Sequence, residues 1–196
     1  MLSYSLRTIA QVASVAEVVI AVPEGFESAA RAEAAAAGLA VPVKITPGGN
    51  ERQDSVRIAL ELTSSESAIV IVHDAARPLV TPAIFEACIA AASRAGGAIA
   101  AIPVSDTLKR FADGAISATV ARAGLWQAQT PQAFRRALLV AAHQRALNEK
   151  IVATDDADLV ERTGARVEVI EASTDNTKIT TPSDLAIAEA IIAARV

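Results

Sequence analysis

Residues 70–80 of the chain, VIVHDAARPLV, place an imidazole, a carboxylate and a guanidinium directly after an apolar run. His73, Asp74 and Arg77 could together bind a phosphorylated ligand or a cation, since arginine favours phosphate and carboxylates favour hard cations. They could equally form a capped turn, in which Asp74 accepts backbone N–H groups and pairs with Arg77 at the surface. This stretch by itself leaves both interpretations open.

A glycine pair precedes a predicted helix in PGGNERQDSV, residues 47–56. Glycines before a helix N-terminus, with Arg52 and Ser55 in the first turns, suit the binding of an anion. The alternative is a plain glycine turn followed by a helix cap, because one glycine pair is a weak signal.

Three further polar stretches follow predicted strands or loops: PVSDTLKR at 103–110, TDDADLVERTG at 154–164 and STDNTKIT at 173–180. The first could be only a solvated edge. In the second, Thr154 or Asp155 could cap a helix, or the carboxylates could hold a divalent cation. In the third, Lys178 follows an Asx turn and could contact phosphate or lie in solvent.

Apolar strands alternate with amphipathic helices along most of the chain. The predicted strands are 16–23, 41–49, 68–78, 98–104 and 166–172, and the predicted helices are 2–12, 28–39, 52–62, 82–97, 131–148 and 183–195. This order predicts right-handed βαβ units and a mostly parallel, doubly wound α/β sheet. Ligands bind beyond the carboxyl ends of such strands, where the polar stretches are expected.

The alternation is interrupted at about residues 105–130. A turn at Asp113–Gly114, flanked by short alternating runs, predicts an extended β-arm that could dock a second subunit. No linker or repeat divides the chain, so one domain over residues 1–196 is expected.

Composition limits the class of protein without naming a function. The net charge is −4, which argues against nonspecific nucleic-acid binding, and no apolar run is long enough to span a bilayer. One cysteine, Cys88, and the lack of a recognisable export signal favour the cytoplasm. His73 and His143 have no metal-ligand partner at suitable spacing, so no zinc site is predicted.

Taken in order, the polar stretches resemble a known family. The stretches GGNERQDSV, VHDAARPLV, PVSDTLKR, GLWQAQTPQAF, TDDADLVE and DNTKITTPSDLAIAEAI occur in the order and approximate spacing of the 2-C-methyl-D-erythritol 4-phosphate cytidylyltransferase family. The resemblance implies a Rossmann-like nucleotidyltransferase fold and a cytidylyl transfer from CTP to the sugar-alcohol phosphate, with release of pyrophosphate. Mg²⁺ is the implied cofactor and non-mevalonate isoprenoid synthesis the implied pathway. The alternatives are a pentitol-phosphate cytidylyltransferase and a non-catalytic dimerising homolog.

The resemblance also implies roles for particular residues. The residues implied near the nucleotide are Gly49, Asn50, Arg52, Ser55 and Ala75. The residues implied near the substrate are Asp74, Arg77, Thr107, Thr130 and Thr154. The implied catalytic pair is Arg122 and Lys178, and the metal candidates are Asp74 and Asp175. Asn50 stands where an aspartate is often found in the family. Because Thr107 and Arg122 lie on the arm, the family pattern implies a homodimer in which they reach the partner's site.

One departure from the family pattern affects the expected sheet. Family members begin with a strand and a loop of the form P-A-A-G-x-G-x-R, followed by P-K-Q, whereas this sequence starts at the helix after them. We therefore expect a sheet without its first strand and a groove lined by unpaired backbone groups. The loop supplies much of the triphosphate site, so the chain as given is either a product of a misplaced start or a remnant without turnover. The intact later motifs favour the misplaced start.

Overall fold

The computed structural model describes residues 1–195 as alternating helices and strands joined by short loops. The helices are α1 (Leu2–Ile9), α2 (Glu27–Ala36), α3 (Arg52–Glu61), α4 (Pro82–Ala95), α5 (Arg136–Glu149), α6 (Asp156–Glu161) and α7 (Pro182–Ala194). The strands are β1 (Val18–Val22), β2 (Val43–Pro47), β3 (Ile69–Val72), β4 (Gly97–Pro103), β5 (Leu108–Ala112), β6 (Ala115–Val120), β7 (Trp126–Arg135) and β8 (Val167–Glu171).

The strands form three separate sheets. The largest has the order β3-β7-β4-β8, in which β7 is antiparallel to both neighbours and β4 runs parallel to β8. A second sheet consists of the parallel pair β1–β2, and the third is the antiparallel hairpin β5–β6. The predicted α/β class is confirmed, while the sheet between residues 18 and 171 is divided and mixed.

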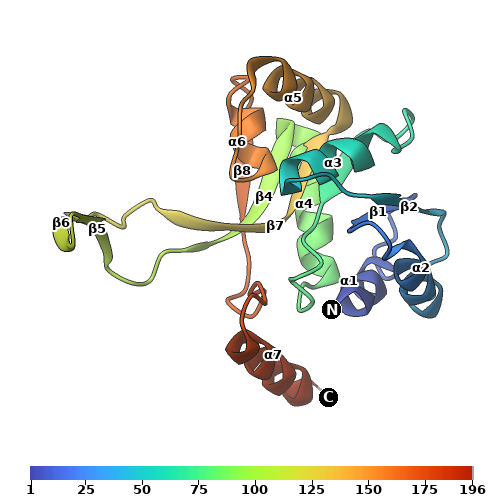
Figure 1. The fold of residues 1–196 in the computed structure, drawn as a ribbon, viewed down its shortest axis with the longest axis horizontal. Coiled ribbons are helices and arrows are strands. Elements are labelled where there is room, and N and C mark those ends of the chain that lie inside the picture. Colours follow the sequence, from blue (N-terminus) through green and yellow to red (C-terminus); the bar gives the residue numbers. More distant parts are fainter. Residues whose placement is uncertain (196) are drawn as a thin grey trace.

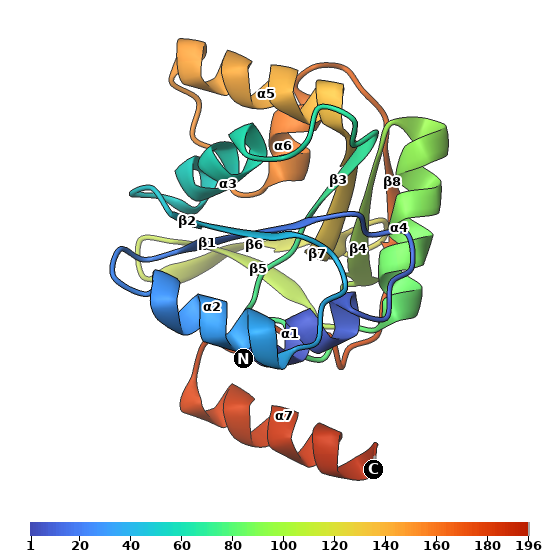
Figure 2. The ribbon, with the colours of Figure 1, turned by 90° about the vertical axis from the view of Figure 1, so that its right-hand side faces the viewer.

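Helices cover both faces of the four-stranded sheet (Figure 2). Successive side chains of a strand point to opposite faces, so Ala133 of β7 packs with Cys88 of α4 while Phe134 packs with Leu139 of α5. Alanines dominate the α4 side, which lets this helix lie close to the strands. Cys88 is fully buried in this layer, and burial raises the pKa of its thiol to about 12, so its role is packing.

The prediction of a helix from residue 131 is wrong. Residues 126–135 form β7, and the helix begins only at Arg136. Residues from Gln129 to Phe134 are buried, and a strand covered on both faces lacks the alternation that would distinguish it from a helix. Pro131, interpreted as a helix start, instead follows a cis peptide bond inside the strand.

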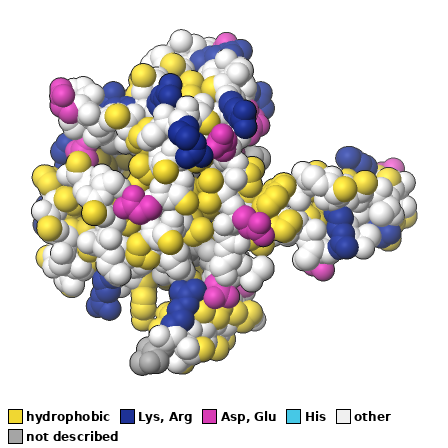
Figure 3. All heavy atoms as spheres, turned by 180° about the vertical axis from the view of Figure 1, so that it is seen from behind, with side chains coloured by type: hydrophobic (Ala, Val, Ile, Leu, Met, Phe, Trp, Pro, Cys, Tyr) yellow, Lys and Arg dark blue, Asp and Glu magenta, His cyan; other side chains and the backbone are white. Residues whose placement is uncertain are grey.

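The hairpin β5–β6 projects from the body as an arm (Figures 1 and 3). Its turn lies at Asp113 and Gly114, whose φ angles of +50° and +80° place both in the left-handed region. The predicted arm and turn are thus confirmed. Phe111 and Ile116 are 71% and 65% exposed, so the arm presents large apolar side chains to its surroundings.

The C-terminal helix α7 lies apart from the body of the molecule (Figures 1 and 2). Its N-cap is Thr181, which exchanges a reciprocal pair of hydrogen bonds with Asp184, and Pro182 occupies the first turn. The prediction of a helix over residues 183–195 with Ser183 as its N-cap is thus wrong at the start, because the N-cap is Thr181 and the helix begins at Pro182. None of the helices within residues 1–195 has the length and apolar character needed to cross a membrane.

Candidate functional site

Asp74 lies just beyond the carboxyl end of β3 and is held by two cations. Its Oδ1 accepts a hydrogen bond from Arg52 Nε at 3.0 Å, and its Oδ2 lies 3.1 Å from Lys178 Nζ. Arg52 comes from the first turn of α3, and Lys178 comes from the loop before α7. Three segments far apart in sequence therefore meet at one carboxylate.

The charge of Asp74 is stabilised by these neighbours. Burial alone would raise its pKa, but Arg52 and then Lys178 outweigh that effect and lower the pKa below its ordinary value. Asp74 is therefore ionised at neutral pH. Of the two cations, Lys178 is the more exposed, so it is the one placed to reach a phosphorylated ligand.

Arg52 joins Asp74 to a second, fully buried carboxylate. Its Nη1 donates to Oδ2 of Asp156 at 2.8 Å, and Oδ1 of Asp156 lies 3.0 Å from His143 Nε2. Burial alone would lower the pKa of Arg52, but Asp156 and then Asp74 raise it above its ordinary value. The guanidinium is thus fixed between two anions, with one edge turned to the interior of the protein.

Thr130, at the middle of β7, orients the chain around Asp74. Its Oγ1 accepts a hydrogen bond from the Asp74 backbone N–H at 3.0 Å and lies 3.1 Å from His73 Nδ1. His73 Nε2 lies 3.2 Å from the carbonyl oxygen of Arg77, which fits a neutral ring that donates from Nε2 and accepts at Nδ1. Burial lowers the pKa of His73 to about 4, in agreement with a neutral ring.

Arg77 is anchored beside Asp74 by the loop that carries Lys178. Its Nη1 donates to the carbonyl oxygen of Asn176 at 2.8 Å, while its Nε has no hydrogen-bond partner within residues 1–195. The buried amide of Asn176 donates to the Thr130 carbonyl at 3.0 Å and fixes this loop against β7. Arg77 is therefore held by one edge, with donor capacity remaining for a ligand.

The glycine pair packs tightly on the start of α3. The Gly49 N–H donates to Ser55 Oγ at 3.0 Å, and a Cβ at Gly49 would lie 2.3 Å from the Asp54 Cβ. Glycine is required here by close approach to the helix. Ser55 thus supports the turn in this structure, whereas its predicted nucleotide contact stays a prediction.

The remaining predicted residues fall into two groups. Asn50, Ala75 and Thr154 are exposed on loops. Asn50 precedes α3, Ala75 follows Asp74 directly, and Thr154 lies in the loop before α6. Thr107, just before β5, and Arg122, shortly after β6, are exposed, and neither is among the hydrogen-bond or ion-pair partners of Asp74 within residues 1–195. The structure therefore brings together Arg52, Asp74, Arg77, Thr130 and Lys178, and it leaves the arm residues outside this group.

The second metal candidate, Asp175, has a different partner. Its Oδ2 lies 3.1 Å from Arg195 Nη2, so its carboxylate joins the loop to the end of α7. Across residues 1–195 no group of three or more His, Cys, Asp or Glu side chains is placed to hold a metal. A cation at Asp74 would therefore depend on ligand oxygens, as is common for Mg²⁺.

Sequence reasoning missed two members of the site. The sequence pattern places Asp156 only among the carboxylates at a helix start, where Asp155 is the N-cap and accepts from the Asp158 N–H at 2.9 Å. His143 was noted only as lacking a metal partner. The signal that pairs them is weak, because His143 and Asp156 lie on different helices and their contact depends on how α5 packs on α6.

The fold and the site together define an α/β protein with a cationic ligand site at the carboxyl ends of its strands. The family model for "2-C-methyl-D-erythritol 4-phosphate cytidylyltransferase" matches residues 1–194. The chain belongs to this family.

Curated relatives carry the same description. One from Syntrophotalea carbinolica is 51% identical over 149 residues, which are 76% of this chain and 64% of that protein. One from Deinococcus radiodurans is 44% identical over 186 residues, which are 94% of this chain and 75% of that protein. The matched region thus spans about two thirds to three quarters of the length of these relatives.

Solved structures of similar proteins have the same fold. The crystal structure of the Thermus thermophilus cytidylyltransferase is 37% identical, with a TM-score of 0.84, and the comparison covers all of this chain and 89% of that chain. The 4-diphosphocytidyl-2C-methyl-D-erythritol synthase of Anaerococcus prevotii is 26% identical, with a TM-score of 0.89 over 97% of this chain and 88% of that chain.

Proposed function

We propose that the protein transfers a cytidylyl group from CTP to 2-C-methyl-D-erythritol 4-phosphate. A phosphate oxygen of the sugar-alcohol phosphate attacks the α-phosphorus of CTP, the bond to the β-phosphate oxygen breaks, and pyrophosphate leaves. Such transfers depend mainly on positioning and on charge stabilisation, so the protein must supply fixed cations around the phosphates. Family membership and the residues around Asp74 support this proposal.

The observation that carries the proposal is the placement of Asp74 between Arg52 and Lys178. Lys178 Nζ is partly exposed, so it can turn from Asp74 to a phosphate oxygen when a ligand binds. Arg77 has donor capacity left on a guanidinium that Asn176 holds by one edge, and it is proposed to bind the substrate phosphate.

Mg²⁺ is the proposed cofactor, and Asp74 is its proposed protein ligand. The carboxylate is ionised and lies at the strand end, which fits a cation that takes one carboxylate together with triphosphate oxygens. The Asp175 carboxylate pairs with Arg195, so it would have to leave that partner to reach the cation. When bound, the cation would neutralise charge on the phosphates and so assist departure of pyrophosphate.

A homodimer is the proposed assembly, with the arm as its contact. The arm exposes Phe111 and Ile116, which a partner could bury, and the exposed Arg122 follows its strand β6. Arg122 and Thr107 would then complete the site of the partner subunit. A cytoplasmic location is also proposed, since a chain with one cysteine cannot form an internal disulfide that would need an oxidising compartment.

The experiment is a direct assay of the chain with CTP, Mg²⁺ and methylerythritol phosphate, following pyrophosphate release and the CDP-linked product. A pentitol phosphate is tested in parallel as the competing substrate. Product with methylerythritol phosphate supports the proposal, and preference for the pentitol phosphate would replace the substrate. Absence of both products together with no CTP binding by calorimetry would favour the non-catalytic homolog.

A further inference from the structure

Asn176 is buried in a loop whose other residues are at least partly exposed. It is 3% exposed, whereas every other residue from 172 to 181 is half-buried or exposed. The loop joins β8 to α7 and carries Lys178 two positions further on. Burying a polar side chain costs free energy unless it is hydrogen-bonded, so the partners of Asn176 show what holds this loop.

Both hydrogens of the Asn176 amide are donated to β7. Its Nδ2 donates to Gln129 Oε1 at 2.8 Å and to the Thr130 carbonyl at 3.0 Å. A backbone carbonyl can only accept, so the contact with Thr130 determines which end of the amide faces the strand. Gln129 and Thr130 are themselves buried, so the loop is held against a part of the strand that is closed to solvent.

The backbone next to this amide holds the loop that follows β3. Arg77 Nη1 donates to the Asn176 carbonyl at 2.8 Å, and the Ile179 N–H donates to the Ala76 carbonyl at 2.8 Å. Lys178 lies between these two attachment points in the chain. A displacement of Asn176 would therefore move Lys178 and the guanidinium of Arg77 together.

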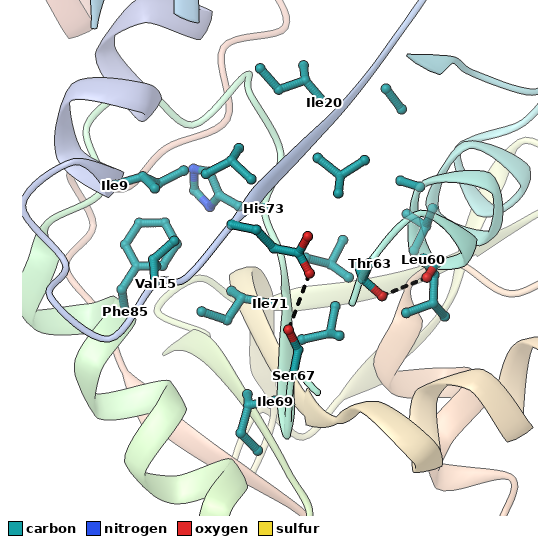
Figure 4. Close-up of a pocket in the computed structure, with 18 of the residues that line it drawn as sticks. Ile9, Val15, Ile20, Leu60, Thr63, Ser67, Ile69, Ile71, His73 and Phe85 are labelled. Carbon is teal, nitrogen blue, oxygen red and sulfur yellow. Dashed lines mark hydrogen bonds between the residues drawn. The ribbon is translucent and has the colours of Figure 1, made fainter. Parts of the chain in front are cut away.

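Thr130 connects the same part of β7 to Asp74. Its Oγ1 accepts from the Asp74 N–H at 3.0 Å and lies 3.1 Å from His73 Nδ1. The His73 ring lies beside Phe85 in the wall of a pocket, with the two ring centroids 5.1 Å apart (Figure 4). Thr130 therefore fixes Asp74 through its hydroxyl and Asn176 through its carbonyl, so one buried residue holds both loops.

We propose that Asn176 is a positioning residue of the candidate site: its two hydrogen bonds to β7 set where the Arg77 guanidinium and the Lys178 ammonium stand. The side chain is buried, so it acts on a ligand only through these neighbours. The identity of that ligand, the phosphate group of methylerythritol phosphate, rests on the proposed function. Hydrogen bonds weaken steeply when their geometry is distorted, so a loop that is no longer held should bind the phosphate less tightly.

A role in stability alone would have a different result. If Asn176 only held the fold together, its loss would lower the free energy of unfolding but leave the folded molecules with an unchanged affinity for the ligand. A positioning role changes the folded molecules themselves, both in the loop and in the affinity.

The first measurement needs no ligand. Asn176→Asp keeps the size of the side chain, but the ionised carboxylate has no hydrogen to donate and places an oxygen against the Thr130 carbonyl. Residue-resolved amide exchange by NMR should become about 10-fold faster at the Ile179 N–H, because its bond to the loop after β3 opens more often. The Ala172 N–H, which bonds to the Ala101 carbonyl beside β8, should change little.

The second measurement is titration calorimetry on the same variant. The Kd for methylerythritol phosphate should rise about 10-fold, as expected when one charge-assisted hydrogen bond is lost. The Kd for CTP with Mg²⁺ should change by less than about 2-fold, because the nucleotide contacts proposed for Gly49 and Arg52 belong to the start of α3.

Asn148→Asp is the matched control. Asn148 is exposed at the end of α5, and its Oδ1 accepts from Gln144 Nε2 at 3.1 Å, a bond that a carboxylate can also accept. The change makes the same difference to the net charge and should alter neither measurement.

Gln129→Met is a second variant that removes the acceptor instead of the donor. It should shift both measurements in the same direction as Asn176→Asp but less, since the bond from Asn176 to Thr130 remains. It also keeps the test decisive if Asn176→Asp fails to fold.

Three results would overturn the proposal. Faster exchange with an unchanged Kd for methylerythritol phosphate would mean that Asn176 holds the loop but does not position the site. Equal effects in Asn148→Asp would mean that the added charge is responsible. Unchanged exchange and unchanged affinity in a folded Asn176→Asp would remove the role altogether.

A failure of the proposed function would be distinguishable from these results. If the wild type binds no methylerythritol phosphate, that substrate is wrong, and inorganic phosphate becomes the probe for the same calorimetry. Weaker phosphate binding by Asn176→Asp than by the wild type, together with faster exchange at Ile179, would then support the positioning role. Equal phosphate binding, or none by the wild type, would overturn it.

Discussion

Arg52 Nη1 lies 2.8 Å from Oδ2 of Asp156, a carboxylate whose side chain is 1% exposed. The same guanidinium holds Asp74 through Nε, so a buried anion behind the site fixes the cation in front of it. Asp156 is itself held by His143, which ties the start of α3 to α5 and α6. The geometry at Asp74 thus depends on residues that face away from the ligand side.

Replacing Asp156 by asparagine should destabilise the protein. The change keeps the size of the side chain but removes the buried negative charge between Arg52 and His143. Breaking a buried ion pair costs about 3–5 kcal/mol, and because Arg52 is partly exposed we expect about 1–3 kcal/mol in the free energy of unfolding. Urea denaturation at pH 7 measures it.

Asp158→Asn is the matched control for this change. Asp158 is on the same helix and pairs with Arg162 at the surface, at 2.7 Å. An exposed pair of this kind is screened by water and contributes little to stability, so the loss should be much smaller than for Asp156→Asn. Equal losses in the two variants would show that the buried contact with Arg52 has no special role.

Replacing Lys178 by alanine should mainly affect turnover. Arg52 still holds Asp74, so the fold is retained, but the partly exposed cation proposed for the phosphates is lost. Removing one charge-stabilising donor from an active site reduces kcat by about 100- to 1,000-fold. Steady-state assays with CTP and methylerythritol phosphate measure the change, and Lys150→Gln, an exposed lysine after α5, serves as the control. Similar kcat values for the two variants would remove Lys178 from the proposed chemistry.

His73 should make stability depend on pH in a defined window. Burial lowers its folded pKa to about 4 from an ordinary value of 6.5, so the unfolded chain takes up a proton first as the pH falls. The neutral ring therefore contributes fully above pH 6.5, and the contribution is lost between pH 6.5 and about 4. At pH 4.5 the loss is about 2–3 kcal/mol relative to pH 7.

The measurement compares urea denaturation of the wild type and His73→Gln at several pH values from 7 to 4.5. The variant lacks the ring that titrates, so its stability should fall less over this range. Asp74 affects stability in a different pH range, because its folded pKa lies below the ordinary value of 3.8. Its contribution to stability is therefore lost only at pH values below the range of His73. Parallel pH profiles for the two proteins would contradict the assignment to His73.

The alternation of apolar strands and helices was sufficient to predict the α/β class, and the Asp113–Gly114 turn was sufficient to predict the arm. Both depend on local sequence signals. Strand β7 was missed because it is buried on both faces and lacks the period of two. Its antiparallel position between β3 and β4 depends on contacts between distant segments, which local patterns do not encode.

The candidate site was predictable to a similar extent. Asp74, Arg77 and Lys178 were identified from strand-end position and family resemblance, and the structure places them close together. Asp156 and His143 were not identified, because a buried ion pair between two helices leaves no mark at fixed spacing in the sequence. The groove expected from the missing first strand corresponds to a cavity lined by residues of β1 and β3, which belong to separate sheets.

If the two subunits of the proposed homodimer share their sites, two variants that are each inactive should recover activity when they are combined. Arg122→Ala removes the arginine that follows β6 of the arm, and Lys178→Ala removes the cation beside Asp74. If the arm completes the partner's site, a mixed dimer contains one site with both residues intact and one site with neither. Random mixing of equal amounts gives about half mixed dimers, so the mixture should recover roughly a quarter of wild-type activity.

The recovery is measured after the two variants are co-expressed with different affinity tags and the doubly tagged dimer is purified. The purified mixed dimer should have about half the wild-type activity per chain pair, since one of its two sites is intact. A double variant carrying both changes on one chain, mixed with itself, is the control and should remain inactive. An inactive mixed dimer would mean that Arg122 acts on its own subunit or has no part in the reaction, and the arm would then serve contact alone.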